Sequence, residues 1–220
     1  MMSSHWKGPL VPTTSRPMPI APVSSCQAAA IPRDAAPFVL AFGDSLTAGY
    51  GLARDEAFPA RLQALLRPTL SGAVVRDDGV SGDTTRSALA RLPRLLSSLD
   101  RRPDLAIVEL GANDLIRRID PAEVRSNLQA IVREFQRCLI PTLLASVEPP
   151  AFLSAIALTY SGIHGEIGRL YGIDVHPFFP PGVMGHHAHV LRDRLHPNAV
   201  AIDKVAKAML TTVIRHLTHS

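Results

Sequence analysis

Short, mostly apolar runs alternate from Pro37 onward with longer segments in which apolar residues recur at helical spacing. A short run that is apolar at nearly every position is typical of a strand covered on both faces, and glycine or proline often ends it. On this basis strands are predicted at FVLAFG (38–43), AVVRDDGV (73–80), DLAIVELG (104–111), LIPTLLASV (139–147) and IDVHPFF (173–179).

The longer segments between these runs carry the three-to-four-residue spacing of amphipathic helices. Such a repeating alternation of strand and helix predicts an α/β domain whose parallel sheet lies between two layers of helices. Helices are predicted over Phe58–Leu70, Thr84–Leu99, Pro121–Cys138, Ala151–Tyr171 with a break near Gly162, and Asn198–Leu217.

The composition fits one globular domain and argues against several other classes of protein. A chain of 220 residues, 46% of them hydrophobic, is long enough to bury a full core. No apolar run approaches the ~20 residues of a membrane span, so none is expected. Lys and Arg exceed Asp and Glu by 23 − 19 = 4, and no basic block concentrates them, so no nucleic-acid partner is expected. The two cysteines are too few for a disulfide framework.

The first 36 residues differ from the rest of the chain. They are rich in Pro, Ser and Ala and show no periodicity, so residues 1–36 are predicted to be a disordered arm or leader, and residues 37–220 the folded domain. Several prolines interrupt the apolar stretch that an export signal would need. The sequence therefore predicts a soluble protein and leaves both a cytoplasmic and an exported location open.

Polar, glycine-containing motifs follow the first three predicted strands. GDS follows the first strand, GVSGDT the second and GAND the third, while DRLHPN precedes the last predicted helix. In a parallel sheet, functional sites form beyond the carboxyl ends of the strands. Each motif alone is explained as well by a turn or a helix cap. Their joint placement instead predicts that Ser45, Gly82 and Asn113 belong to one site.

Asp193 and His196 supply what a serine nucleophile would need. Acyl transfer requires a base that takes the hydroxyl proton and a group that orients this base. Residues three apart on a turn can share a face, so the Asp193 carboxylate could hold one ring nitrogen of His196 and leave the other free. Pro197 biases His196 away from helical geometry and suits the first turn of the next helix.

Taken together, the blocks GDSLTAGYGL, VSGDTT, VELGAND and DRLHPN resemble the four signature blocks of the SGNH (GDSL) hydrolases. The resemblance runs from about Phe38 to Leu210, and the most similar branch is that of the bacterial thioesterase I/lysophospholipase/arylesterase enzymes. It implies a flavodoxin-like three-layer α/β/α sandwich with a five-stranded parallel sheet. It also implies hydrolysis of esters or thioesters without a metal or any other cofactor.

The resemblance also implies a role for each motif residue. Ser45 would be the nucleophile, His196 the general base and then the general acid, and Asp193 the residue that orients His196. The oxyanion would be held by the backbone N–H groups of Ser45 and Gly82 and by the side-chain amide of Asn113.

The sequence departs from the family pattern beside the histidine. Arg194, two residues before His196, occupies a position at which relatives commonly carry glycine. An arginine next to Asp193 could compete with His196 for the carboxylate.

The expected partner is a small-molecule acyl ester or thioester, and the expected oligomeric state is a monomer or a weak oligomer. Leu115 and Ile116, which follow Asn113, could form part of an acyl-binding wall. The apolar segment EPPAFLSAIALTYSGI (148–163) could be another wall of that pocket or simply the buried face of a helix. The physiological substrate stays open at this stage.

Three other functions are compatible with parts of the sequence. The chain could be a ligand-binding relative without catalysis, although neither a G-x-x-x-x-G-K-[ST] nor a G-x-G-x-x-G motif supports nucleotide binding. It could be a carbohydrate acetylesterase. It could also use a metal, because His186, His187 and His189 cluster in GHHAH, yet no H-E-x-x-H motif accompanies them.

Overall fold

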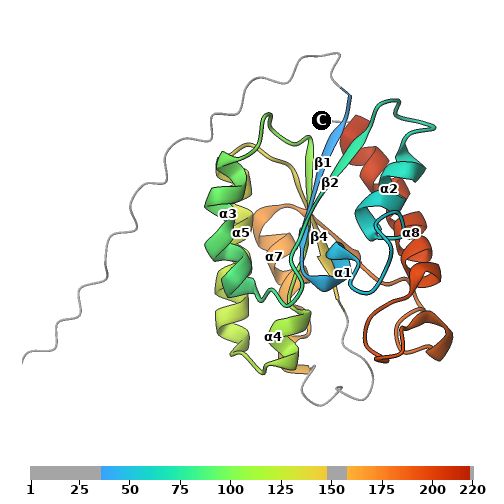
Figure 1. Cartoon of the computed structure of the whole chain (residues 1–220). Helices are drawn as coiled ribbons and strands as arrows, with labels where there is room; N and C mark the ends of the chain where they lie inside the picture. Colours follow the sequence, from blue (N-terminus) through green and yellow to red (C-terminus); the bar gives the residue numbers. More distant parts are fainter. Residues whose placement is uncertain (1–35, 148–157, 219–220) are drawn as a thin grey trace, which may run out of the picture.

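A computed structural model describes residues 36–147 and 158–218 of the chain. Its core is a five-stranded parallel sheet in the order β2-β1-β3-β4-β5 (Figure 1). The strands are β1 (Phe38–Gly43), β2 (Val74–Gly79), β3 (Leu105–Glu109), β4 (Thr142–Ser146) and β5 (Asp174–Pro177). The longer helices are α2 (Phe58–Leu66), α3 (Thr85–Ser97), α5 (Pro121–Arg137), α7 (Ile163–Tyr171) and α8 (Ala199–Thr218).

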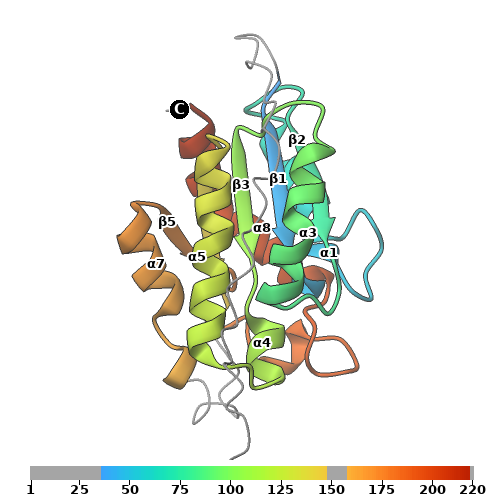
Figure 2. The same cartoon turned by 90° about the vertical axis from the view of Figure 1, so that its left-hand side faces the viewer.

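The side chains of β1 show how the sheet divides the interior into two cores. Successive side chains of a strand point to opposite faces, and all six residues of β1 are buried. Val39 and Ala41 pack into the core between the sheet and helices α2 and α8. Leu40 and Phe42 pack into the other core, beneath α3, α5 and α7. Figure 2 shows these last three helices side by side over their face of the sheet.

Local sequence signals explain where several helices begin. Asp120 caps α5 by accepting a hydrogen bond from the backbone N–H of Ala122, and Pro121 occupies the first helical position. Thr84 and Ser87 form a reciprocal capping box at the start of α3. Leu92 and Leu95 of α3 are buried in the second core, and Leu89 and Leu96 pack partly buried against it.

The predicted fold class is confirmed, and the strands were predicted with few errors. β1 has the predicted bounds, and β4 begins only after Pro141, whose ring nitrogen has no hydrogen to donate to the sheet. The helix predicted over Phe58–Leu70 ends earlier, at Leu66, before a turn that contains Pro68. Two short helices, α1 (Ser45–Ala48) and α4 (Ala112–Ile116), were not predicted.

Two sequence predictions fall largely outside the described residues. The predicted arm at 1–36 shares only residue 36 with the described part, and the helix predicted over Ala151–Tyr171 is described only from residue 158. There, α7 begins after Gly162, where the sequence predicts a break. Within residues 36–147 and 158–218, no helix combines the length and the apolar character that crossing a bilayer requires.

Candidate active site

The loops after the first three strands meet at the carboxyl edge of the sheet, around one cavity. Ser45 begins α1 directly after β1, Gly82 lies in the loop after β2, and Asn113 lies in α4 after β3 (Figure 1). All three line a cavity of about 1020 Å³, and His196 lines it as well. The structure therefore gathers these sequence-predicted residues at the edge where parallel sheets place their sites.

Ser45, His196 and Asp193 form a continuous chain of polar contacts. Oγ of Ser45 lies 3.0 Å from Nε2 of His196, and Nδ1 of the same ring lies 2.7 Å from Oδ2 of Asp193. With Nδ1–H donated to the carboxylate, Nε2 has a free lone pair directed at the serine hydroxyl. An imidazole held in this tautomer can accept the hydroxyl proton, which is the arrangement of an activated nucleophile.

The position of Ser45 follows from the tight junction between β1 and α1. Asp44 caps α1 by accepting a hydrogen bond of 2.9 Å from the backbone N–H of Leu46. A Cβ atom on Gly43 would lie 2.1 Å from Oγ1 of Thr47, so only glycine lets α1 fold back this closely on the strand end. Ser45 is the first residue of α1, where a backbone N–H has no intrahelical partner and is available to a bound group.

A second tight turn presents His196. Oδ1 of Asp193 accepts hydrogen bonds from the backbone N–H groups of Leu195 (2.9 Å) and His196 (3.0 Å). Burial raises the pKa of Asp193, but these hydrogen bonds and the one from the His196 ring outweigh it and hold the pKa below its ordinary value. One carboxylate thus fixes both the turn and the ring, and it stays ionised at neutral pH.

Arg194, between Asp193 and Leu195, has a backbone conformation that is usual for glycine. Arg194 has a φ of 61° in the left-handed region. Glycine would adopt this φ without strain, whereas a residue with a Cβ atom does so at a cost. The possible competition with His196 is not seen, because among the described residues Asp193 pairs with His196 and no ion pair joins it to Arg194. Arg194 therefore introduces backbone strain without diverting the carboxylate.

The loops that carry Gly82 and Asn113 are held by buried or charged side chains. Gly82 has a φ of 87°, and its carbonyl oxygen accepts a hydrogen bond of 2.9 Å from Arg117. The buried Asp114 accepts hydrogen bonds from both the N–H and the hydroxyl of Thr85, which ties α4 to α3. Asn113 donates its side-chain amide to Oδ2 of Asp44 at 3.0 Å.

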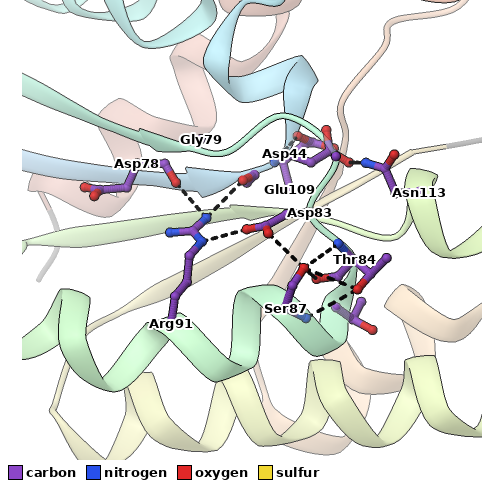
Figure 3. A network of polar contacts seen from close by, with 12 residues as sticks. Asp44, Asp78, Gly79, Asp83, Thr84, Ser87, Arg91, Glu109 and Asn113 are labelled. Carbon is purple, nitrogen blue, oxygen red and sulfur yellow. Dashed lines mark hydrogen bonds and ion pairs between the residues drawn. The ribbon is translucent and has the colours of Figure 1, made fainter.

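Arg91 links the carboxyl ends of β1 and β2 through hydrogen bonds (Figure 3). From α3 it donates to the carbonyl oxygens of Gly43 (3.1 Å) and Asp78 (2.9 Å), and it forms an ion pair of 2.6 Å with Asp83. Its guanidinium also lies 4.3 Å from the centre of the Phe42 ring. These contacts neutralise the carbonyl ends of β1 and β2 beneath the loops that carry Ser45 and Gly82.

Several side chains near the site were not identified from the sequence. Tyr50 lies over the imidazole of His196, with ring centres 4.4 Å apart. His164 contacts the carbonyl oxygen of Leu110 at 3.0 Å, and burial lowers its pKa. Asp44, Arg91 and Arg117, described above, are three more. Their places beside the site depend on tertiary contacts that the sequence does not show. For Tyr50, the glycines on both sides of it do mark a tight loop in the sequence.

The loop that carries the histidine cluster (186–189) supports the turn of His196 through its backbone carbonyl groups. Asn198, which follows Pro197, donates its backbone N–H to the carbonyl of His189 and its side-chain amide to the carbonyl of Ala188. Nε2 of His189 lies 2.8 Å from the ammonium group of Lys204. Within residues 36–147 and 158–218, no group of three or more metal-ligating side chains has the arrangement to hold a metal ion.

The predicted apolar wall lies in the cavity. Leu115 and Ile116 both line it, and the first is buried while the second is exposed. Of the apolar segment 148–163, residues 148–157 lie outside the described part of the chain. Its remaining residues contribute Leu158, Tyr160 and Ile163 to the lining.

Comparisons with known proteins agree with this geometry. The model of the GDSL-like Lipase/Acylhydrolase family matches residues 41–201. An arylesterase of Vibrio mimicus is 30% identical over 81% of this chain and 89% of its own length. The thioesterase 1/protease 1/lysophospholipase L1 of Escherichia coli is 31% identical over 80% of this chain and 82% of its own length.

Solved structures of two similar proteins share the fold. The crystal structure of TesA has a TM-score of 0.77 and 29% identity, and the match covers 82% of this chain and 99% of that one. The SGNH-hydrolase family esterase AlinE4 has a TM-score of 0.67 and 38% identity, over 83% of this chain and 97% of that one. Since both the family model and these relatives span most of the folded chain, the protein belongs to the GDSL-like lipase/acylhydrolase (SGNH hydrolase) family.

Proposed function

We propose that this protein is a serine hydrolase that cleaves carboxylic esters or thioesters of acyl chains through an acyl-enzyme on Ser45. The observation that carries the proposal is the chain of contacts from Ser45 through His196 to Asp193 at the edge of the cavity. The names of the relatives, an arylesterase and a thioesterase/lysophospholipase, support the same reaction class.

The proposed reaction has two halves that use the same groups. Oγ of Ser45 attacks the carbonyl carbon of the substrate while Nε2 of His196 takes the hydroxyl proton, and the Asp193 carboxylate stabilises the resulting imidazolium. The tetrahedral intermediate collapses when His196 gives that proton to the departing alcohol or thiol. Water then attacks the acyl-enzyme by the reverse sequence of proton transfers, which releases the acid and restores Ser45.

Three donors are proposed for the oxyanion of the tetrahedral intermediate. The N–H of Ser45 lies at the first position of α1, and the N–H of Gly82 lies in a turn of left-handed geometry. Asn113 has one amide hydrogen on Asp44, which leaves the second one for the oxyanion. Donors that are fixed before the reaction stabilise developing charge without a reorganisation cost.

The lining of the cavity supports an acyl chain as the group that is transferred. At about 1020 Å³ the cavity is at the upper end of the usual size of ligand sites, roughly 300–1,000 Å³. Its walls carry apolar side chains from several elements: Leu115, Ile116, Val124, Val147, Leu158, Ile163, Val175 and Met184. In a carbohydrate acetate, the polar hydroxyl groups of the sugar would lie against these apolar walls. An ester with a longer acyl chain is therefore favoured over a carbohydrate acetate.

The substrate class is tested with p-nitrophenyl esters of increasing acyl length, at pH 8, with and without EDTA. We expect hydrolysis that EDTA does not change, and kcat/KM that rises with chain length beyond acetate because each buried CH₂ contributes about 0.8 kcal/mol. A preference for acetate over every longer ester would contradict the acyl pocket. Loss of activity with EDTA would contradict the metal-free reaction.

Removal of one oxyanion donor should slow catalysis without weakening substrate binding. In Asn113→Ala, we expect kcat to fall about 10²- to 10³-fold with KM nearly unchanged, because the donor acts mainly on the transition state. Steady-state kinetics on the best p-nitrophenyl ester measure both constants. Asn127→Ala, which removes an amide from α5 outside the cavity lining, is the matched control. A rise in KM with constant kcat would show that Asn113 binds the substrate instead.

A further inference from the structure

The buried carboxyl group of Glu109 contacts Asp44 and Thr47, the residues on either side of the start of α1, and has no role in the reaction described above. Glu109 is the last residue of β3, and no part of it is exposed to solvent. Its Oε2 accepts a hydrogen bond of 2.9 Å from the hydroxyl of Thr47 and a long one of 3.5 Å from the backbone N–H of Asp44. No N–H or O–H group in the described part of the chain donates a hydrogen bond to its buried Oε1.

Glu109 lacks a compensating positive charge among the residues that the structure describes. In the described part of the chain no ion pair includes it, and the nearby Arg91 gives its guanidinium to Asp83 and to the carbonyl oxygens of Gly43 and Asp78. A buried carboxylate without a counter-ion is strongly disfavoured, and such a group takes up a proton instead. Burial first, and the neighbouring Asp44 carboxylate second, raise the pKa of Glu109 well above its ordinary range.

The Asp44 carboxylate can accept a hydrogen bond from a protonated Glu109. The carboxyl groups of Glu109 and Asp44 lie beside each other and interact, and two adjacent buried carboxyl groups can form a hydrogen bond only when one of them is protonated. Asp44 accepts two further hydrogen bonds, from the backbone N–H of Leu46 and the amide of Asn113. Burial raises the pKa of Asp44 to about 6, and these two donors limit the rise. Glu109 receives one ordinary and one long hydrogen bond, and its pKa is raised well above its ordinary range, so the shared proton belongs on Glu109.

The ionised Asp44 in turn determines how Asn113 is oriented. A carboxylate only accepts hydrogen bonds, so the amide nitrogen of Asn113 must face Asp44, and its second hydrogen is left for the cavity. Without its contact with Glu109, the Asp44 side chain would be held only by the Leu46 cap and by the Asn113 amide itself, and it could turn about that cap. The amide of Asn113 would then lose the partner that fixes it.

We propose that Glu109 is a positioning residue that acts as a neutral acid: it donates its proton to Asp44 and thereby fixes the Asn113 amide as an oxyanion donor. The path runs from the end of β3 through the cap of α1 to the first turn of α4 (Figure 3). The inference rests on the proposed function, because it gives Glu109 a role only if Asn113 stabilises the oxyanion.

Two substitutions at Glu109 test whether the hydrogen bond that it donates to Asp44 is what supports catalysis. Glu109→Gln keeps a donor for Asp44 and an acceptor for Thr47, so we expect kcat within about threefold of wild type. Glu109→Leu removes the donor, and we expect kcat to fall about 10- to 100-fold with KM nearly constant, which is part of the effect of losing one oxyanion donor. Glu123→Gln, an acid paired with Arg86 on the surface, is the matched control.

A double-mutant cycle with Asn113→Ala tests the path itself. If Glu109 acts through Asn113, adding Glu109→Leu to Asn113→Ala lowers kcat by less than about twofold, because the donor is already gone. Equal losses in the two backgrounds would show a general structural effect and overturn the proposal. If Asn113→Ala alone kept the wild-type kcat, the oxyanion role would fail first, which distinguishes the two failures.

Infrared spectroscopy tests the proton independently of activity and of whether Glu109→Leu folds. At pH 8 the wild-type protein should show the C=O stretch of a protonated carboxylic acid, and Glu109→Gln should lack that band. If the acid bands of wild type and Glu109→Gln are the same, Glu109 is ionised and the proposal is wrong.

Discussion

Ser45→Ala should reduce kcat for ester hydrolysis about 10⁵- to 10⁶-fold, the loss typical of removing a serine nucleophile from such a site. The fold should survive, because the hydroxyl of Ser45 has one described partner, Nε2 of His196, and such a contact contributes only about 0.5–1.5 kcal/mol to stability. Steady-state kinetics and thermal melting of the purified variant measure the two effects.

The control for this variant is Ser97→Ala. Ser97 ends α3, and its hydroxyl donates to the carbonyl of Pro93 away from the cavity. It should keep wild-type kinetics. If Ser45→Ala retains more than about a hundredth of the wild-type kcat, the serine is not the nucleophile, and the hydrolysis must begin with another group.

Asp193→Asn should have the next largest effect, a loss of about 10⁴-fold in kcat with little change in KM. An amide can present its NH₂ group to Nδ1 of His196, which places the ring proton on Nε2 and leaves no lone pair for Ser45. The amide oxygen can still accept the backbone hydrogen bonds from Leu195 and His196, so the turn should keep its shape.

A matched acid and a double variant make this prediction specific. Asp203→Asn removes a carboxylate that pairs with Arg61 and Lys207 on the surface, and it should keep wild-type activity. The double variant of Ser45→Ala and Asp193→Asn should be no slower than Ser45→Ala alone, because the two residues act as one unit. Multiplicative losses would show that Asp193 acts independently of the serine.

The apolar pattern predicted the framework well because burial on both faces leaves a strong signal in the sequence. FVLAFG reads as a covered strand at every position, and β1 has those bounds. The short helices α1 and α4 span only four and five residues, too few for helical periodicity to show. What the sequence showed at these places was the glycines, which mark the tight junctions on both sides of Ser45 and before Asn113.

The residues of the proposed site could be named from the sequence, whereas the contacts that support them could not. Ser45 and His196 are 151 positions apart, and four motifs in order placed both at one edge of the sheet. Glu109 lies within the apolar run DLAIVELG, where nothing in the sequence distinguishes a buried acid from a strand end. Its partners, Asp44 and Thr47, are more than 60 positions away, so only the packed sheet brings them together.

The most direct test of the serine mechanism is covalent labelling with an organophosphonate probe, followed by mass spectrometry of the peptides. We expect one phosphonyl group on Ser45 of the wild-type protein, no labelling of Ser45→Ala, and much slower labelling of Asp193→Asn. A wild-type protein that hydrolyses esters but stays unlabelled at Ser45, or that carries the label on another residue, would contradict the assignment of Ser45 as the nucleophile.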